Sequence, residues 1–323
     1  MRCQIKKTEI MKKFLTREIV AKLGLNKVKV ITADMLYGYT NIDCFAFQFC
    51  PYLEAITIPN SITSIGNEAF EDCTSLTSVT IGNSVTSIGD NAFYGCSKLT
   101  SVTIPNSVTS IGGYAFSHCV NLETIDIPDS VTIIGNAAFS NCVRLAFAKI
   151  GKSVTTIGNN AFIYCKTLKS ITIPKSVTGI EYRAFAHCSN LSSVSIPNSV
   201  TYIGEYVLWD SSNLKSITIG DKEYKNHEVV NGKCKAYKAF NADMTCRNFQ
   251  YKEGKTYEFY GEPKLCECGF HACLNLFDVF DYYSGRINEE FVVCEVELEG
   301  VTEEHAVDSK VAAKKITIGK RIL

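Results

Sequence analysis

The sequence has little of several features that would assign it to a familiar class. Its 323 residues carry 33 Lys+Arg and 33 Asp+Glu, so no net charge marks it as a nucleic-acid binder. No apolar run approaches the ~18–20 residues that a membrane span needs. Charges interrupt the apolar positions of the first residues, so no signal-peptide core is present. A membrane span, a secretory leader and a simple basic DNA module are therefore not expected.

Cysteine, by contrast, is abundant. The chain has 15 cysteines, an odd number, whereas secreted disulfide scaffolds are usually short and have an even number. We therefore expect reduced cysteines and a cytoplasmic location, with non-classical export or virion association left open. Met1 and Met11 are both candidate start residues.

A repeat dominates the sequence: the interval from Leu53 to Leu76 recurs without change, and leucine occupies every equivalent position up to Leu214. The shared pattern of one unit is L-x-x-I-x-I-P-x-S-V-T-x-I-G-x-x-A-F-x-x-C-x-x. Alternating apolar positions predict two short strands in each unit, followed by a short helical turn or loop that points Phe and Cys inward. Because one unit cannot bury these groups alone, the units should stack around one continuous core. The glycines after the second strand are expected to turn the chain with positive φ; they are Gly66, Gly89, Gly112, Gly135, Gly158 and Gly204.

This pattern resembles the BspA-like leucine-rich repeats over roughly residues 30–220. The resemblance implies a right-handed α/β leucine-rich-repeat solenoid that is used for binding, and it implies no catalysis. We divide the chain into an N-terminal helical cap or basic arm (1–29), the solenoid (30–222) and a small α+β domain (233–323). In the cap, Thr16 is expected to begin a helix that ends at Gly24.

Cysteine also recurs once in each of seven units, which raises the question of a metal or redox ladder. Equivalent side chains on adjacent units should run parallel about 4.8 Å apart, whereas a disulfide needs Cβ atoms about 3.8 Å apart that face each other. Small buried groups are therefore the favoured interpretation; the residues are Cys50, Cys73, Cys96, Cys119, Cys142, Cys165 and Cys188.

The outward positions of the first strand are mostly Ser or Thr, which suit a crowded parallel sheet. A flat threonine array would order water or ice, but Asp126, Phe147 and Lys149 interrupt it. An aromatic residue between opposite charges is a candidate hot spot for a partner, although neutral drift on a tolerant surface gives the same pattern.

The C-terminal region lacks the repeat. Its motifs resemble those of an uncharacterised domain that occurs in phage and bacterial proteins, with no activity implied; they are Tyr237-Lys238, Gly254-Lys255, Gly269-Phe270-His271-Ala272-Cys273, Asp278-Val279 and Asp308-Ser309-Lys310-Val311-Ala312.

Three chemistries are open for the motif around His271. The first is a zinc site, although the spacing C-x-C-x-x-H-x-C is unusual; its ligands would be Cys266, Cys268, His271 and Cys273. The second is a nucleophilic cysteine beside His271. The third is a site like that of an ADP-ribosyl transferase, formed by Tyr237, His271 and Glu295 or Glu297. The alternative is that these residues only pack the small domain.

We therefore expect a non-enzymatic recognition protein from a bacterium or phage that needs no cofactor and binds a protein or glycan with its sheet face. Nucleic acid is not an expected partner, and the oligomeric state is open. The alternative is an effector-type enzyme or metal-binding protein in which the repeats target the domain around His271.

Overall fold

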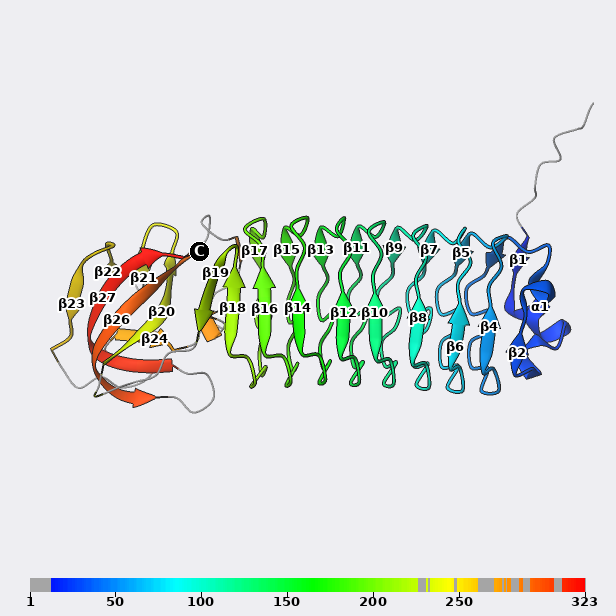
Figure 1. Cartoon of the computed structure of the whole chain (residues 1–323), viewed down its shortest axis with the longest axis horizontal. Helices are drawn as coiled ribbons and strands as arrows, with labels where there is room; N and C mark the ends of the chain where they lie inside the picture. Colours follow the sequence, from blue (N-terminus) through cyan, green and yellow to red (C-terminus); the bar gives the residue numbers. More distant parts are fainter. Residues whose placement is uncertain are drawn as a thin grey trace, which may run out of the picture.

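The computed structural model describes residues 13–225, 231, 233–246, 249–260, 270–274, 276, 278–279, 285–286, 291–304 and 310–322. Figure 1 shows a straight rod of stacked coils that carries a smaller sheet at its C-terminal end. Each coil has three faces, two built from strands and one built from turns.

The rod begins with a cap. The helix α1 (Arg17–Lys22) starts after Thr16, whose hydroxyl oxygen accepts a hydrogen bond from Ile19 N at 3.3 Å. Gly24 follows with φ 69°, a left-handed conformation that ends the helix. The short helices η1 (Leu25–Lys27) and η2 (Ala33–Leu36) complete the cap. Val20 and Leu25 are buried, so the cap covers the open end of the core.

The second strand of each unit forms one long parallel sheet, in which each strand from β3 onward pairs with its equivalent in the next unit. Its members are β1 (Phe14–Leu15), β3 (Asn41–Ile42), β5 (Ser64–Ile65), β7 (Ser87–Ile88), β9 (Ser110–Ile111), β11 (Ile133–Ile134), β13 (Thr156–Ile157), β15 (Gly179–Ile180) and β17 (Tyr202–Ile203).

The first strand of each unit forms what we call the strand face. It is divided into two sheets, because β12 and β14 lie side by side without a ladder of hydrogen bonds. The first sheet holds β2 (Val30–Ile31), β4 (Ala55–Thr57), β6 (Ser78–Thr80), β8 (Ser101–Thr103), β10 (Thr124–Asp126) and β12 (Phe147–Lys149). The second holds β14 (Ser170–Thr172), β16 (Ser193–Ile196), β18 (Ser216–Ile219) and the antiparallel β19 (Lys222–Lys225).

The A-F-x-x-C segments form the third face, the turn face, and they are not helical. In one coil Tyr114 and His118 adopt φ of 55° and 60°. Their backbone N–H groups donate to Asn136 O at 2.7 Å and Ser140 O at 2.9 Å in the next coil. The turns thus carry their own inter-coil hydrogen bonds. Within the described residues α1 is the single α-helix, so the predicted leucine-rich-repeat solenoid is confirmed but is a β-solenoid rather than an α/β one.

The prediction that the repeat glycines have positive φ is wrong. None of the six has positive φ. They are required because a Cβ would collide with the backbone of the preceding coil: at Gly112 it would lie 2.5 Å from the carbonyl carbon of Gly89. One coil departs from the pattern, with Glu181 at this position and Gly179 two residues earlier.

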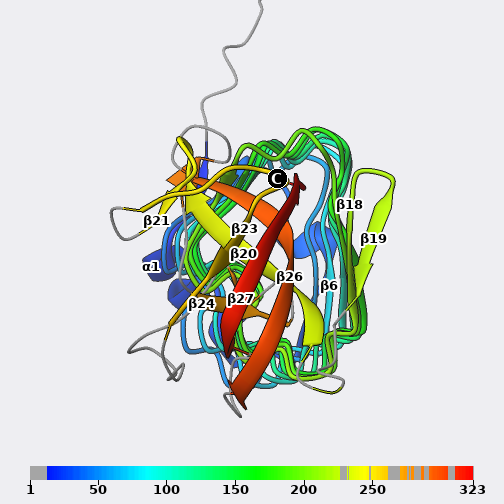
Figure 2. The ribbon, with the colours of Figure 1, turned by 90° about the vertical axis from the view of Figure 1, so that its left-hand side faces the viewer.

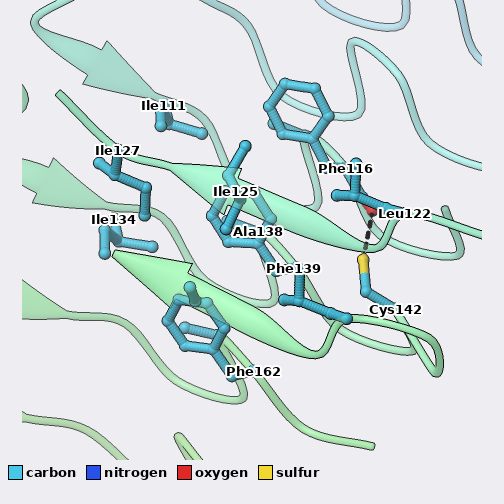
Figure 3. Close-up of a cluster of buried hydrophobic side chains, with 14 of the residues drawn as sticks. Ile111, Phe116, Leu122, Ile125, Ile127, Ile134, Ala138, Phe139, Cys142 and Phe162 are labelled. Carbon is cyan, nitrogen blue, oxygen red and sulfur yellow. Dashed lines mark hydrogen bonds between the residues drawn. The ribbon is translucent and has the colours of Figure 1, made fainter. Parts of the chain in front are cut away.

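The core consists of aligned columns of side chains. The predicted continuous core is confirmed, because every leucine of the register from Leu53 to Leu214 is at most 2% exposed. Seven phenylalanines from Phe47 to Phe185 form a stack with ring centroids 5.1 to 5.5 Å apart. Figure 3 shows part of these columns. Their apolar area, removed from water by stacking, is the main source of stability.

The repeat cysteines lie beside this stack. The thiol of Cys142 donates to Phe116 O of an earlier coil at 3.2 Å (Figure 3), and the equivalent bond recurs from Cys73 to Cys188. In the last coil Ser211 makes the same bond to Phe185 O. The thiols are free and buried, as expected for small core groups.

The C-terminal domain is an antiparallel sheet in the order β23-β27-β24-β20-β26, and it closes on itself because β26 also pairs with β27. Its strands are β20 (Lys233–Asn241), β23 (Thr256–Glu258), β24 (Phe270–Cys273), β26 (Phe291–Glu304) and β27 (Lys310–Arg321). The short pair β21 (Thr245–Cys246) and β22 (Phe249–Gln250) lies outside this sheet.

This domain lies across the end of the rod (Figure 2). The strand β25 (Gly285–Arg286) extends the long sheet by pairing antiparallel with β17. Alternate residues of β20 and β26 divide between two cores: Tyr237 and Val293 join the core of the solenoid, whereas Ala236 and Val292 face the interior of the domain. The domain therefore seals the last coil.

Candidate binding surface

The structure brings Asp126, Phe147 and Lys149 together on the strand face; we call these three residues the strand-face patch. Parallel pairing of β10 with β12 sets Asp126 opposite Lys149 and Thr124 opposite Phe147. Lys149 Nζ lies 3.0 Å from both carboxylate oxygens of Asp126. Phe147 is 53% exposed, so its ring is open to solvent beside an ion pair.

Two more ion pairs link the same two coils. Arg144 contacts Glu123 at 3.1 Å and Lys152 contacts Asp129 at 3.4 Å. The backbone N–H of Lys152 also donates to Asp129, which lowers the pKa of that carboxyl. Exposed pairs of this kind contribute little stability, about 0–1 kcal/mol each. Their consequence is that the acidic groups beside the patch are already occupied.

The next coil carries basic residues whose charges no ion pair in the described chain balances. Lys166, Lys169 and Lys175 are exposed, and within the described part of the chain none of them has an ion-pair partner. Residues 130–180 contain six Lys or Arg and no Asp or Glu. On its C-terminal side the strand-face patch therefore borders a positive surface.

A second cluster lies on the turn face, and sequence reasoning missed it. The guanidinium carbon of Arg183 lies 4.9 to 5.3 Å from the ring centroids of Tyr182, Tyr206 and Trp209, a cation–π arrangement. Its Nε is buried without a hydrogen-bond partner. Comparing equivalent positions of successive units would have found it, because the residues equivalent to Arg183 and Trp209 in earlier coils include Asn160 and Ser140.

A histidine extends this cluster. The ring of His187 stacks on Tyr164 with centroids 4.3 Å apart, and its Nδ1 lies 2.8 Å from Asp210 Oδ2. The side chains are thus engaged with one another. The cluster links the last coils next to the C-terminal domain.

The C-terminal candidates are described in part. Tyr237 is buried, and its hydroxyl donates to Lys225 O at 3.0 Å. Burial, followed by the nearby charge of Glu295, raises the pKa of Tyr237. Strand pairing sets Tyr237 opposite both Cys273 and Glu295. Tyr237 therefore connects the domain to β19.

The remaining candidates are not tested. His271 lies in β24, where its backbone pairs with Ala312 of β27, and Cys273 is buried. Cys266 and Cys268 lie outside the described residues. Among the residues that the structure describes, no group of three potential metal ligands occurs. The zinc and transferase hypotheses stay predictions.

Comparison with known families agrees with this geometry. Residues 40–169 and 133–253 match the BspA type leucine rich repeat region, in six copies. The chain belongs to the BspA-type leucine-rich-repeat family. Residues 234–323 match a domain of unknown function, DUF7666. No curated protein sequence matches the chain, and no helix in the described ranges is long and apolar enough to cross a bilayer.

Solved structures of leucine-rich-repeat proteins are similar to this BspA-type chain. One from Bacteroides ovatus has 29% identity and a TM-score of 0.49, with 61% of this chain and 64% of that chain covered. A leucine rich cell surface protein from Faecalibacterium prausnitzii has 30% identity and a TM-score of 0.38, with 57% and 64% covered. The leucine-rich-repeat protein of T. pallidum has 26% identity and a TM-score of 0.44, with 58% and 78% covered. The chain thus spans less than two thirds of the first two proteins.

Proposed function

We propose that the protein is a non-enzymatic recognition scaffold that binds a protein partner through the strand-face patch. The observation that carries the proposal is the exposed ring of Phe147, at a position where the adjacent strands β10 and β14 carry threonine and serine. A hot spot commonly combines an aromatic anchor with adjacent charged groups. Lys149 and Asp126 supply those groups, and their ion pair holds them in place.

The scaffold makes such a small site effective. Each coil is fixed to its neighbours by hydrogen bonds, and the coils from Phe47 to Phe185 are also fixed by the phenylalanine stack, so few groups lose freedom when a partner binds. A preorganised surface spends less of its interaction energy on ordering. A few side chains are therefore sufficient to set specificity.

The test is a double substitution to the local consensus, Phe147→Ser with Lys149→Thr. Partners captured from lysate by the wild-type protein should be lost from this variant. The matched control is Ile133→Ser. It removes an aliphatic side chain that is also 53% exposed but lies in β11 of the long parallel sheet. Unchanged partners in the double variant, or equal losses in the control, would refute the proposal; capture of glycan instead of protein would redirect it.

We also propose that the protein resides in the cytoplasm. The support is the set of free thiols, one of which, Cys44, is exposed, because an oxidising compartment favours disulfides. Fractionation of the source cells tests this, and recovery from the medium or from virions would contradict it.

A further inference from the structure

We infer that the partner contributes an extended acidic segment with one apolar side chain, docked along β14 beside Phe147. This inference rests on the proposed function and deepens it by naming the chemistry of the partner. It follows from how charge is distributed around the break in the strand face.

Charge is the first argument. The charged residues on the two sides of Phe147 differ in whether they have ion-pair partners. On one side Glu123, Asp126 and Asp129 each hold a basic partner. On the other side Lys169 and Lys175 flank β14 and have no ion-pair partner among the described residues. An acidic partner forms ion pairs with these lysines, whereas a basic one meets like charges that cost several kcal/mol.

Spacing is the second argument. Lys169 precedes the first residue of β14, and Lys175 follows its last residue by three positions. Six residue steps at ~3.3 Å each give a separation of at most ~20 Å. An extended peptide covers this distance in about six residues. The segment therefore places its carboxylates near its two ends.

The position of Phe147 fixes the middle of the segment. Ser170 in β14 is the equivalent of Phe147 in the next coil, and the two strands β12 and β14 lie side by side. The outward side chains of β14 are Ser170 and Thr172, which are small, so the ring of Phe147 stands above its neighbours. An apolar side chain between the two carboxylates can rest against this ring and the hydroxyl surface. The strand face is interrupted between β12 and β14, which are the strands that carry Phe147 and Ser170.

Nucleic acid fits these residues less well. Binding that is driven by phosphate typically uses about six to ten phosphate contacts, and single strands also need several stacking aromatics. Here three of the six basic residues between 130 and 180 are already paired, and Phe147 is the one exposed aromatic on the strand face in the described residues. An acidic protein segment needs no more than this.

The experiment selects peptides from a displayed library of random dodecapeptides on the full-length protein. We expect enrichment of sequences with Asp or Glu on both sides of an apolar residue. The variant Lys169→Ser with Lys175→Ser should weaken a selected peptide about tenfold. The control, Lys98→Ser with Lys215→Ser, removes the same charge from exposed lysines elsewhere and should change nothing. Raising the salt from about 0.1 M to about 1 M should weaken binding to the wild type more than to the lysine variant.

The outcomes separate this inference from the proposed function. Peptides that require Phe147 but tolerate loss of Lys169 and Lys175 refute the acidic segment and leave the proposed function standing. Peptides that bind the Phe147→Ser, Lys149→Thr variant equally well refute both. No enrichment, or enrichment of neutral or basic sequences, refutes the inference. Binding of a poly-dT oligonucleotide or heparin that depends on Lys169 and Lys175, without peptide binding, overturns it in favour of a different polyanion.

Discussion

Two adjacent glycines allow the packing of the coils to be tested by a single methyl group. At Gly112 an added Cβ would lie 2.5 Å from the carbonyl carbon of Gly89 and 2.6 Å from Asp90 N, both backbone atoms. At Gly113 the nearest heavy atom, Asn136 O, would be 3.4 Å away, an ordinary contact. Neither glycine has positive φ. Conformational freedom alone therefore predicts that Ala is accepted equally at both.

The expected magnitude follows from the separation that Gly112→Ala needs. Restoring a 3.4 Å contact moves the coils apart by 3.4 − 2.5 = 0.9 Å at this point. The hydrogen bond from Gly112 N to Ile88 O, 2.9 Å long, would then exceed the usual limit of about 3.2 Å. Losing it costs about 1 kcal/mol, and overpacking adds about 1–3 kcal/mol. A smaller unfolded-state entropy offsets about 0.4–1 kcal/mol, which leaves Gly112→Ala destabilised by about 1–3.6 kcal/mol.

Gly113→Ala should be neutral or up to about 1 kcal/mol more stable, because only the entropic effect remains. Urea unfolding followed by far-ultraviolet circular dichroism measures both variants, with the m-values compared to detect partial unfolding of single coils. Glu181 shows that the backbone can yield at the Gly112 position, so destabilisation rather than failure to fold is expected. Equal stability of the two alanine variants would show that contact between coils is not what requires glycine.

Three further predictions test the core and the turn face. In the native protein a thiol reagent should modify Cys44 quickly and Cys188 only after unfolding, because burial raises the pKa of the Cys188 thiol to about 12; fast modification of Cys188, detected by mass spectrometry, would contradict its place in the core. Phe139→Ala should lower the free energy of unfolding by about 3–5 kcal/mol, and a loss below about 1 kcal/mol in urea unfolding would show that the stack is not close-packed. Burial, followed by neighbouring Glu71, raises the pKa of Glu68 above 4.5, so its charge destabilises the folded state at neutral pH. Glu68→Gln should therefore raise the free energy of unfolding at pH 7, by less than about 1 kcal/mol, and this advantage should vanish as the pH falls through the raised pKa; a constant advantage would point to a cause other than ionisation.

The solenoid could be predicted from the sequence because the repeat supplies the same observation eight times. A single leucine has many possible environments, but Leu53 and its equivalents can share one only if the coils stack by translation. The same reasoning predicted buried cysteines. It failed for Gly112, because both positive φ and close approach favour glycine and the sequence cannot separate them.

The C-terminal domain offered no such repetition. Its sheet closes through pairing of β26 with β27 and of β24 with β20, contacts that no local pattern encodes. The sequence also could not predict that Tyr237 packs in the solenoid core. The alternation of residues along a strand defines its two faces, but it does not show which face contacts another domain. For the strand-face patch, the constant length of the repeat was sufficient to place Asp126 beside Lys149.

Stacking itself restricts where specificity can be encoded. Inward positions must repeat, since each column of leucine, phenylalanine or cysteine continues into the next coil. Only outward departures from the repeat can distinguish one partner from another. In the turn-face cluster, Arg183 and His187 are engaged by neighbouring rings and by Asp210. On the strand face Phe147 and the lysines beyond it have no such partners within the described chain. Phe147 and these lysines are therefore open to a partner, which is why we place recognition on the strand face.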